Sequence, residues 1–320
     1  MFGNISKLGL AILALAWSAG AQPSQGTAET PVVLEVDVEN QVQYRSDIAE
    51  PARRGMDPNA TTAGPARAFT DVLFIGDIVA VNGRRARGTW TSRQFLMNFS
   101  PAPAPGFAIG DVTRGTLADC KWEFLDENGR FVGAIIDSGY FPHAVTGGIG
   151  AFLGVKGQMS GGTHPNPRPV RVASMAEDPG HRRMLGGGTS RIVFHLYPLE
   201  RPSVVEVLDS SFRPVTAANP ARRGDYVIVR ASGLGPVTPG NIPAGSRPFS
   251  SEPLEEVNSN VEATINGQAS EVLNKVGWPG EKNIYRVDVR IPAGIEPGTA
   301  ALVLSAAWIP AVAEFRFPVR

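Results

Sequence analysis

Several polar residues stand at the ends of apolar runs, where side chains commonly take part in binding or catalysis. Asp137 closes the run 131–136, and Tyr140 and His143 lie just beyond it. In an array of hairpins these three side chains are expected near the mouth of the sheet, where they either line a cavity entrance or serve as turn and rim residues. His195 alternates with apolar neighbours, so it faces away from them, toward a lumen or toward solvent. Asp137, Tyr140 and His195 are therefore candidate ligand-binding residues.

Asp77 is a second kind of candidate, a carboxyl group within an apolar stretch. It follows Leu73 and Ile75 at intervals of two residues, so in a strand it shares a face with apolar side chains. Burial on that face would raise its pKa and suit it to proton transfer. The alternative is that Asp77 ends its strand at a wet rim and has no chemical role.

The other reactive residue types favour neither a metal site nor a nucleophile. His143, His164, His181 and His195 show none of the spacings of helical zinc motifs, so no metal and no cofactor is expected. No G-x-S-x-G sequence is present, which disfavours that class of serine hydrolase. Cys120 lies in a stretch that alternates polar and apolar residues, on the same face as Trp122 and Phe124. The pattern predicts a buried core thiol.

The elements that would position these residues are β-strands. The 36 Gly and 27 Pro make up about a fifth of the 320 residues and indicate many turns. Asn82-Gly83 and Asn128-Gly129 suit tight hairpin turns. Strands are expected at 32–38 with 42–44, 72–81, 87–99, 115–125, 131–141, 151–159, 170–174 and 192–197. About eight antiparallel strands of this size are expected to close into a barrel.

A second β domain is predicted after Arg201-Pro202. Strand-like runs stand at 204–207, 226–231, 261–265, 285–291, 301–304 and 315–319, separated by turn residues at the spacing of a sandwich. The expected fold class is all-β, with an eight-stranded antiparallel barrel over residues 31–200 and an immunoglobulin-like β-sandwich over residues 203–320.

The first 21 residues read as a secretory signal peptide. Lys7 precedes the apolar run 8–17, and Ala19-Gly20-Ala21 forms an A-x-A cleavage site. The apolar run is too short for a membrane span, which needs about 20 residues. Residues 22–30 are small and polar and are expected to form a disordered leader. The protein is therefore expected to be secreted, with the periplasm and the cell surface as alternative destinations.

The charge balance excludes one class of partner. Thirty Lys and Arg residues cancel 30 Asp and Glu residues, so the chain has no net basic field. Binding to nucleic acid through such a field is therefore not expected.

Residues 147–157, GGIGAFLGVKG, resemble the GGTGxFxxARG signature of dirigent proteins and the related allene oxide cyclase barrels. The strand 72–77 that ends in Asp, the sequence RARG at 85–88 and the strand 193–197 resemble other parts of that pattern in the same order. The resemblance spans about residues 31–200. It implies an eight-stranded barrel with a central apolar cavity, and a homotrimer formed through the barrel. It also implies Asp77 as proton donor or acceptor and Arg85 as charge partner or substrate clamp.

The segments 232–240, 261–267 and 283–292 resemble a β-sandwich domain found at the C-termini of large secreted proteins of soil bacteria. That resemblance implies an accessory module with a cell-surface partner.

Three functions remain open from the sequence. The first is a secreted protein that binds a small apolar or aromatic ligand in the barrel cavity. The second is an isomerase, a cyclase or a coupling guide that uses Asp77 and Arg85. The third is a non-catalytic structural protein whose barrel is filled by its own side chains.

Overall fold

A computed structural model describes residues 30–45, 68–98, 115–126, 128–239 and 245–320. The predicted signal peptide and nearly all of the predicted leader lie outside the described residues. Among the described residues, no helix combines the length and the apolar character that crossing a membrane requires.

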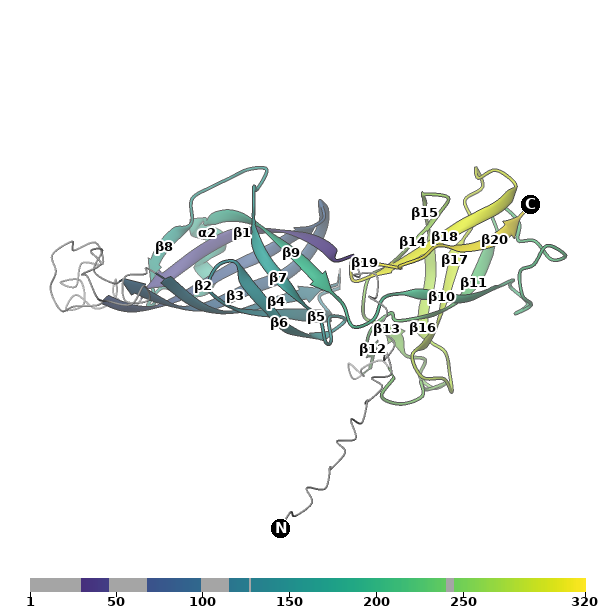
Figure 1. The fold of residues 1–320 in the computed structure, drawn as a ribbon, viewed down its shortest axis with the longest axis horizontal. Helices are drawn as coiled ribbons and strands as arrows, with labels where there is room; N and C mark the ends of the chain where they lie inside the picture. The colour runs from purple at the N-terminus through teal and green to yellow at the C-terminus, as the bar shows by residue number, and fades with distance from the viewer. Residues whose placement is uncertain (1–29, 46–67, 99–114, 127, 240–244) are drawn as a thin grey trace, which may run out of the picture. The chain divides into compact units, whose positions relative to one another are not determined.

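The strands of the first half form a closed antiparallel barrel (Figure 1). In the described part of the chain its eight strands are β1 (Val32–Arg45), β2 (Ala68–Val81), β3 (Arg84–Asn98), β4 (Gly115–Leu125), β5 (Phe131–Gly139), β6 (His143–Gly150), β7 (Lys156–Gly162) and β9 (Gly188–Tyr197). They pair in the order β2-β3-β4-β5-β6-β7-β9-β1, and β1 pairs with β2 to close the ring. The predicted all-β class and eight-stranded antiparallel barrel are confirmed.

Two strands differ from the expectation. The glycine-rich motif contributes β6, for which no strand was expected, whereas residues 151–154 form a turn before β7. The expected strand at 170–174 is β8 (Arg171–Ser174), which pairs in parallel with the end of β1 and is not one of the ring strands. Glycine lowers the apparent strand propensity of β6, but its backbone still pairs with both neighbouring strands.

Large aromatic side chains fill the middle of the barrel. Trp90 of β3 and Trp122 of β4 stand opposite each other and stack with their ring centroids 5.1 Å apart. Phe194 of β9 meets Trp122 edge to face at 5.2 Å, and Phe124 packs on Phe152 at 5.1 Å. Trp122, Phe124 and Phe194 are fully buried. The described interior is therefore a packed core, of the kind expected when a small barrel is filled by its own side chains.

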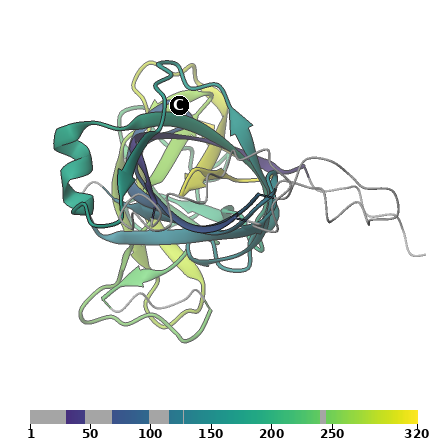
Figure 2. The ribbon, with the colours of Figure 1, turned by 90° about the vertical axis from the view of Figure 1, so that its left-hand side faces the viewer.

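An irregularity in β1 turns part of that strand toward an outer cover. The register of β1 with β2 shifts between Glu39 and Val42, at Asn40, whose φ is 51°. Beyond the shift, Val42 and Tyr44 pack with Ala173 of β8 in a small separate cluster. After β8 the chain continues into η2 (Pro179–His181) and α2 (Arg182–Leu185), which lie outside the ring of strands (Figure 2).

The glycines of the motif at 147–157 permit close packing. A Cβ on Gly148 would lie 2.3 Å from the carbonyl oxygen of Phe152, which no side chain could tolerate. Gly150 has a φ of 66°, in the region that favours glycine, and a Cβ there would lie 2.6 Å from the carbonyl oxygen of Val132. These residues therefore shape the bend between β6 and β7.

The second half of the chain folds into two further antiparallel sheets. The first has the order β10 (Ser203–Leu208), β11 (Tyr226–Ser232), β17 (Ile284–Arg290), β16 (Val272–Gly277), β13 (Glu256–Val257) and β12 (Val237–Thr238). The second contains β15 (Gln268–Ser270), β14 (Val261–Ile265), β18 (Gly298–Ala306), β19 (Ile309–Pro310) and β20 (Phe315–Val319).

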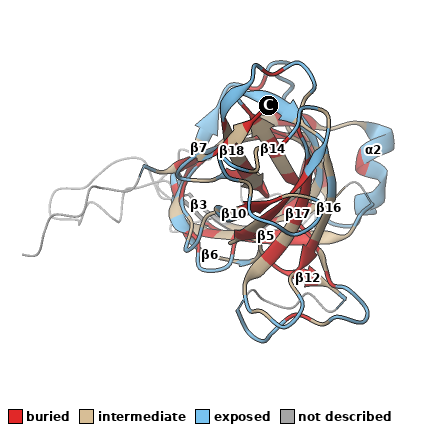
Figure 3. Cartoon of the chain, turned by 90° about the vertical axis from the view of Figure 1, so that its right-hand side faces the viewer, coloured by how far each residue is buried: buried red, intermediate tan, exposed pale blue. Residues whose placement is uncertain are grey.

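Buried residues from both of these sheets form one hydrophobic core, and Figure 3 shows buried segments along β14, β17 and β18, in contrast to the exposed α2. The arrangement is consistent with the predicted β-sandwich. The domain limits at residues 200 and 203 remain predictions.

The packed interior makes a prediction about stability. Replacing Phe124 by Ala should lower the free energy of unfolding by about 3–5 kcal/mol, because it removes a fully buried ring and leaves a cavity. Urea denaturation followed by circular dichroism would measure the change. Lys121→Ala, on an exposed position of the same strand, should change the stability by less than about 0.5 kcal/mol. Equal effects of the two substitutions would contradict a filled interior.

Candidate functional site

Asp77 lies on the outer face of the barrel, beneath the η2–α2 segment. Its neighbour Gly76 faces inward, where an added Cβ would meet Val38 and Trp90. Asp77 is 7% exposed, and its carboxylate accepts hydrogen bonds from three side chains. The donors are Arg182 Nη2 at 2.5 Å, Arg183 Nε and Nη2 at 2.8 Å each, and Asn40 Nδ2 at 3.0 Å.

This network fixes the charge state of Asp77. Burial alone would raise the pKa of the carboxyl, but the hydrogen bonds from the three donors outweigh burial and hold the pKa at about 2. A carboxylate held in this way is a poor proton donor near neutral pH. Its geometry suits it to fastening the α2 segment to the barrel wall.

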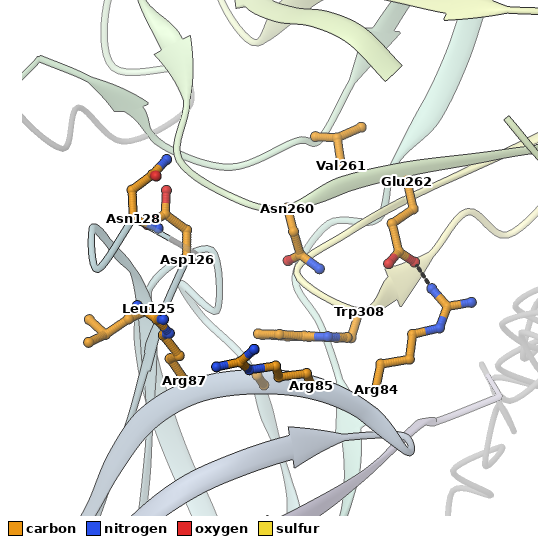
Figure 4. A pocket seen from close by; sticks show the side chains of 11 residues that line it. Arg84, Arg85, Arg87, Leu125, Asp126, Asn128, Asn260, Val261, Glu262 and Trp308 are labelled. Carbon is orange, nitrogen blue, oxygen red and sulfur yellow. Dashed lines mark hydrogen bonds and ion pairs between the residues drawn. The ribbon is translucent and has the colours of Figure 1, made fainter. Parts of the chain in front are cut away.

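Arg85 lies in a pocket at the hairpin between β2 and β3 (Figure 4). We call this the hairpin pocket; its volume is about 600 Å³. Its lining comes from the hairpin, from the turn after β4, from the start of β14 and from the segment between β18 and β19. The lining residues are Arg84, Arg85, Ala86, Arg87, Leu125, Asp126, Asn128, Asn260, Val261, Glu262 and Trp308.

The hairpin pocket combines an aromatic surface with polar groups of both signs. Figure 4 shows the three arginines on one side and Asn260, Val261 and Glu262 on the other. Arg84 forms an ion pair with Glu262, whereas Arg85 makes no ion pair within the described residues. The buried Oδ1 of Asn260 has no hydrogen-bond partner in the described structure. Trp308 is partly exposed and packs on Phe124 with ring centroids 5.4 Å apart.

A separate polar cluster lies inside the barrel wall, formed by Cys120, Asp137 and His143, which we call the interior triad. All three residues are buried, and one donor atom from each lies within 4.8 Å of the others. Nδ1 of His143 is 2.6 Å from Oδ1 of Asp137 and 3.6 Å from Sγ of Cys120. Trp122 Nε1 donates to Oδ2 of Asp137 at 2.5 Å.

Cys120 is held as a neutral thiol. Burial, followed by the nearby Asp137 carboxylate, raises the pKa of Cys120 to about 12. Its thiol donates to Ser92 Oγ at 3.1 Å. The sequence prediction of a buried thiol on the face of Trp122 and Phe124 is confirmed.

The interior triad does not have the geometry of a nucleophilic triad. Catalysis of that kind places the nucleophile on one ring nitrogen of histidine and the carboxylate on the other. Here Cys120 and Asp137 both face Nδ1 of His143. The arrangement instead presents sulfur, nitrogen and oxygen donors around a common point.

Of the five residues predicted from the sequence, only Asp137 belongs to the interior triad. Tyr140 is 55% exposed in the turn between β5 and β6. His195 is exposed and pairs with exposed Val33, so it faces solvent on the outer wall. Asp77 and Arg85 do not contact each other, and each has the separate surroundings described above.

The sequence placed His143 near Asp137 at the mouth of the sheet, but it did not bring Cys120 to them, because the three residues lie on three strands. The register provides the signal: Cys120 stands opposite Asp137 across β4 and β5, and His143 begins the next strand. Arg182 and Arg183 were missed as partners of Asp77 because more than 100 residues separate them from it.

Comparison of the chain with protein-family models, with curated proteins and with solved structures finds no match.

The Asp77 network predicts a dependence of stability on pH. Because the pKa of Asp77 is lowered on folding, its stabilisation is present above its ordinary value of 3.8 and is lost as the pH falls through about 2. Asp77→Asn should therefore lower the free energy of unfolding by about 2 kcal/mol at pH 7, with the difference from wild type shrinking toward pH 2.

Chemical denaturation at several pH values would measure this difference. Asp119→Asn, at an exposed position on β4, serves as the matched carboxyl control and should show little change. A difference for Asp77→Asn that stayed constant down to pH 2 would contradict the assigned charge network.

Proposed function

We propose that the protein is an exported small-molecule-binding protein whose barrel is dirigent-like or allene oxide cyclase-like and whose second domain is an immunoglobulin-like accessory module. The ligand is a small aromatic molecule that carries an anionic group and a hydrogen-bond donor. It binds in the hairpin pocket, at one end of the barrel. The observation that carries the proposal is the combination of Arg85, Asn260 and Trp308 around one pocket.

Each of these three residues offers a different interaction. Arg85 makes no ion pair within the described residues, so its guanidinium is available to an anionic group. Asn260 lines the pocket, and its buried Oδ1 has no hydrogen-bond partner among the described residues, which is costly; a turn of the amide toward the pocket would let it accept from a ligand hydroxyl. The partly exposed indole of Trp308 gives an aromatic ring a surface on which to pack.

The packed barrel interior explains why the ligand is assigned to the end of the barrel. Trp90, Trp122 and Phe194 fill the described middle of the ring. The same packing favours a second candidate function, that of a non-catalytic structural protein. Ligand binding in the hairpin pocket distinguishes the two candidates.

Catalysis by Asp77 and Arg85 receives less support from the geometry. Both oxygens of Asp77 are engaged by Arg182, Arg183 or Asn40 on the outer face of the barrel. Arg85 acts in the proposal as a clamp for the ligand, which is one of the two roles that the family resemblance implies.

Binding can be tested with p-coumarate and its neutral methyl ester, which share a phenol ring and differ in charge. The full chain should bind p-coumarate more tightly than the ester, measured by isothermal titration calorimetry. Arg85→Ala should weaken binding of the acid by about 10-fold to 100-fold, because it removes a charged hydrogen bond, and should reduce the preference for the acid over the ester.

Two further variants sharpen the assignment. Trp308→Ala should weaken the binding of both compounds. Arg316→Ala should change the binding of neither, because Arg316 is paired with Glu314 and does not line the pocket. Binding that survives both Arg85→Ala and Trp308→Ala would place the ligand elsewhere. Absence of binding by either compound would favour the structural function.

A further inference from the structure

We propose that Cys120, Asp137 and His143 form a zinc-binding site in the barrel wall. The three residues supply one sulfur, one nitrogen and one oxygen donor, which is a ligand set that zinc accepts. The site is separate from the hairpin pocket and does not depend on the function proposed for that pocket.

The distance between sulfur and nitrogen in the interior triad suits a tetrahedral ion. Ligands at about 2.0–2.3 Å from zinc place a nitrogen and a sulfur about 3.5 Å apart. Sγ of Cys120 and Nδ1 of His143 are 3.6 Å apart. Oδ1 of Asp137 is closer to Nδ1, at 2.6 Å, because these two atoms share a proton as a hydrogen bond. For zinc to bind, this contact would have to open from 2.6 Å to about 3.3 Å, the separation of nitrogen and oxygen ligands around a tetrahedral ion.

The charge of the site balances when zinc is bound. The two positive charges of zinc would be matched by a thiolate from Cys120 and a carboxylate from Asp137, with His143 as a neutral imidazole. The thiol proton of Cys120 would leave to solvent as zinc binds. The occupied site is therefore neutral, as burial requires.

The residues around the interior triad are placed to support a thiolate and a carboxylate. Within the described part of the chain, the buried Nε1 of Trp90 has no hydrogen-bond partner, and it lies near enough to the Cys120 sulfur to favour a thiolate there. A thiolate ligand would accept this unused donor. Ser92 Oγ lies 3.1 Å from the same sulfur and can reverse its role to donate. Trp122 Nε1 holds Oδ2 of Asp137 and leaves Oδ1 for the metal. Such outer donors commonly orient metal ligands.

Metal titration of the full chain tests the proposal. Zinc should bind with a stoichiometry of one ion per chain in calorimetry, with release of the Cys120 thiol proton, measured by comparing buffers of different ionisation enthalpy. Cobalt(II), as a coloured substitute, should produce a sulfur-to-cobalt charge-transfer absorption. Because Cys120 is the single cysteine of the chain, that absorption identifies its sulfur as a ligand.

Substitutions distinguish the residues that bind the metal from residues that do not. Cys120→Ser should abolish the cobalt charge-transfer absorption and weaken zinc binding by more than about 100-fold, and His143→Gln should weaken it similarly. Trp90→Phe should weaken zinc binding by about 10-fold, since it removes only the outer donor. His195→Gln, at an exposed histidine on the outer wall, should leave binding unchanged. Circular dichroism without metal checks that each variant folds.

Two results would overturn the site. One is a wild-type protein that binds cobalt without the charge-transfer absorption, or that binds no metal. The other is zinc binding that persists in a folded Cys120→Ser variant and is lost in His195→Gln. Should Cys120→Ser or His143→Gln fail to fold, the cobalt spectrum of the wild-type protein still shows whether the Cys120 sulfur binds the metal.

Discussion

The stack of Trp90 on Trp122 is the packing interaction on which the barrel depends. Two indole rings from adjacent strands, with Phe194 closing on their edge, occupy the space that a larger barrel would leave for a ligand. Burial of rings of this size provides much of the driving force for closing such a sheet. The same rings exclude bulky ligands from the middle, so binding has to use an end of the barrel or small gaps in its wall.

The stack also accounts for the polar groups that remain buried. A buried indole N–H group usually finds an acceptor, and Trp122 finds one in Asp137. The other oxygen of that carboxylate pairs with Nδ1 of His143, which stands at the start of β6. Cys120 stands directly opposite Asp137 across β4 and β5, so the strand register alone makes it the third residue of the interior triad. A packing requirement of one aromatic ring thus leads to a cluster of three metal-ligating groups.

Local patterns were sufficient to predict the class of fold but not the surroundings of individual side chains. Alternation around Cys120 placed it correctly beside Trp122 and Phe124, because a period of two is a property of the strand itself. Asp77 has the same kind of pattern, yet it lies on the outer face and is buried by α2, a segment about 100 residues away. The shift in β1 at Asn40 brings a further donor to Asp77 and has no clear signature in the sequence. Burial of a strand residue thus has two causes, the core and an outer cover, which alternation alone does not distinguish.

The glycine-rich motif shows why a pattern can predict packing and still hide an element. Gly148 and Gly150 allow close contacts, because the missing Cβ atoms leave room for backbone from neighbouring segments. Their low strand propensity conceals β6, although tertiary pairing with β5 and β7 overrides it. His143 stands at the start of that hidden strand. Its role beside Asp137 could therefore be seen only once β6 was placed, because a residue assigned to a loop has no defined register with its neighbours.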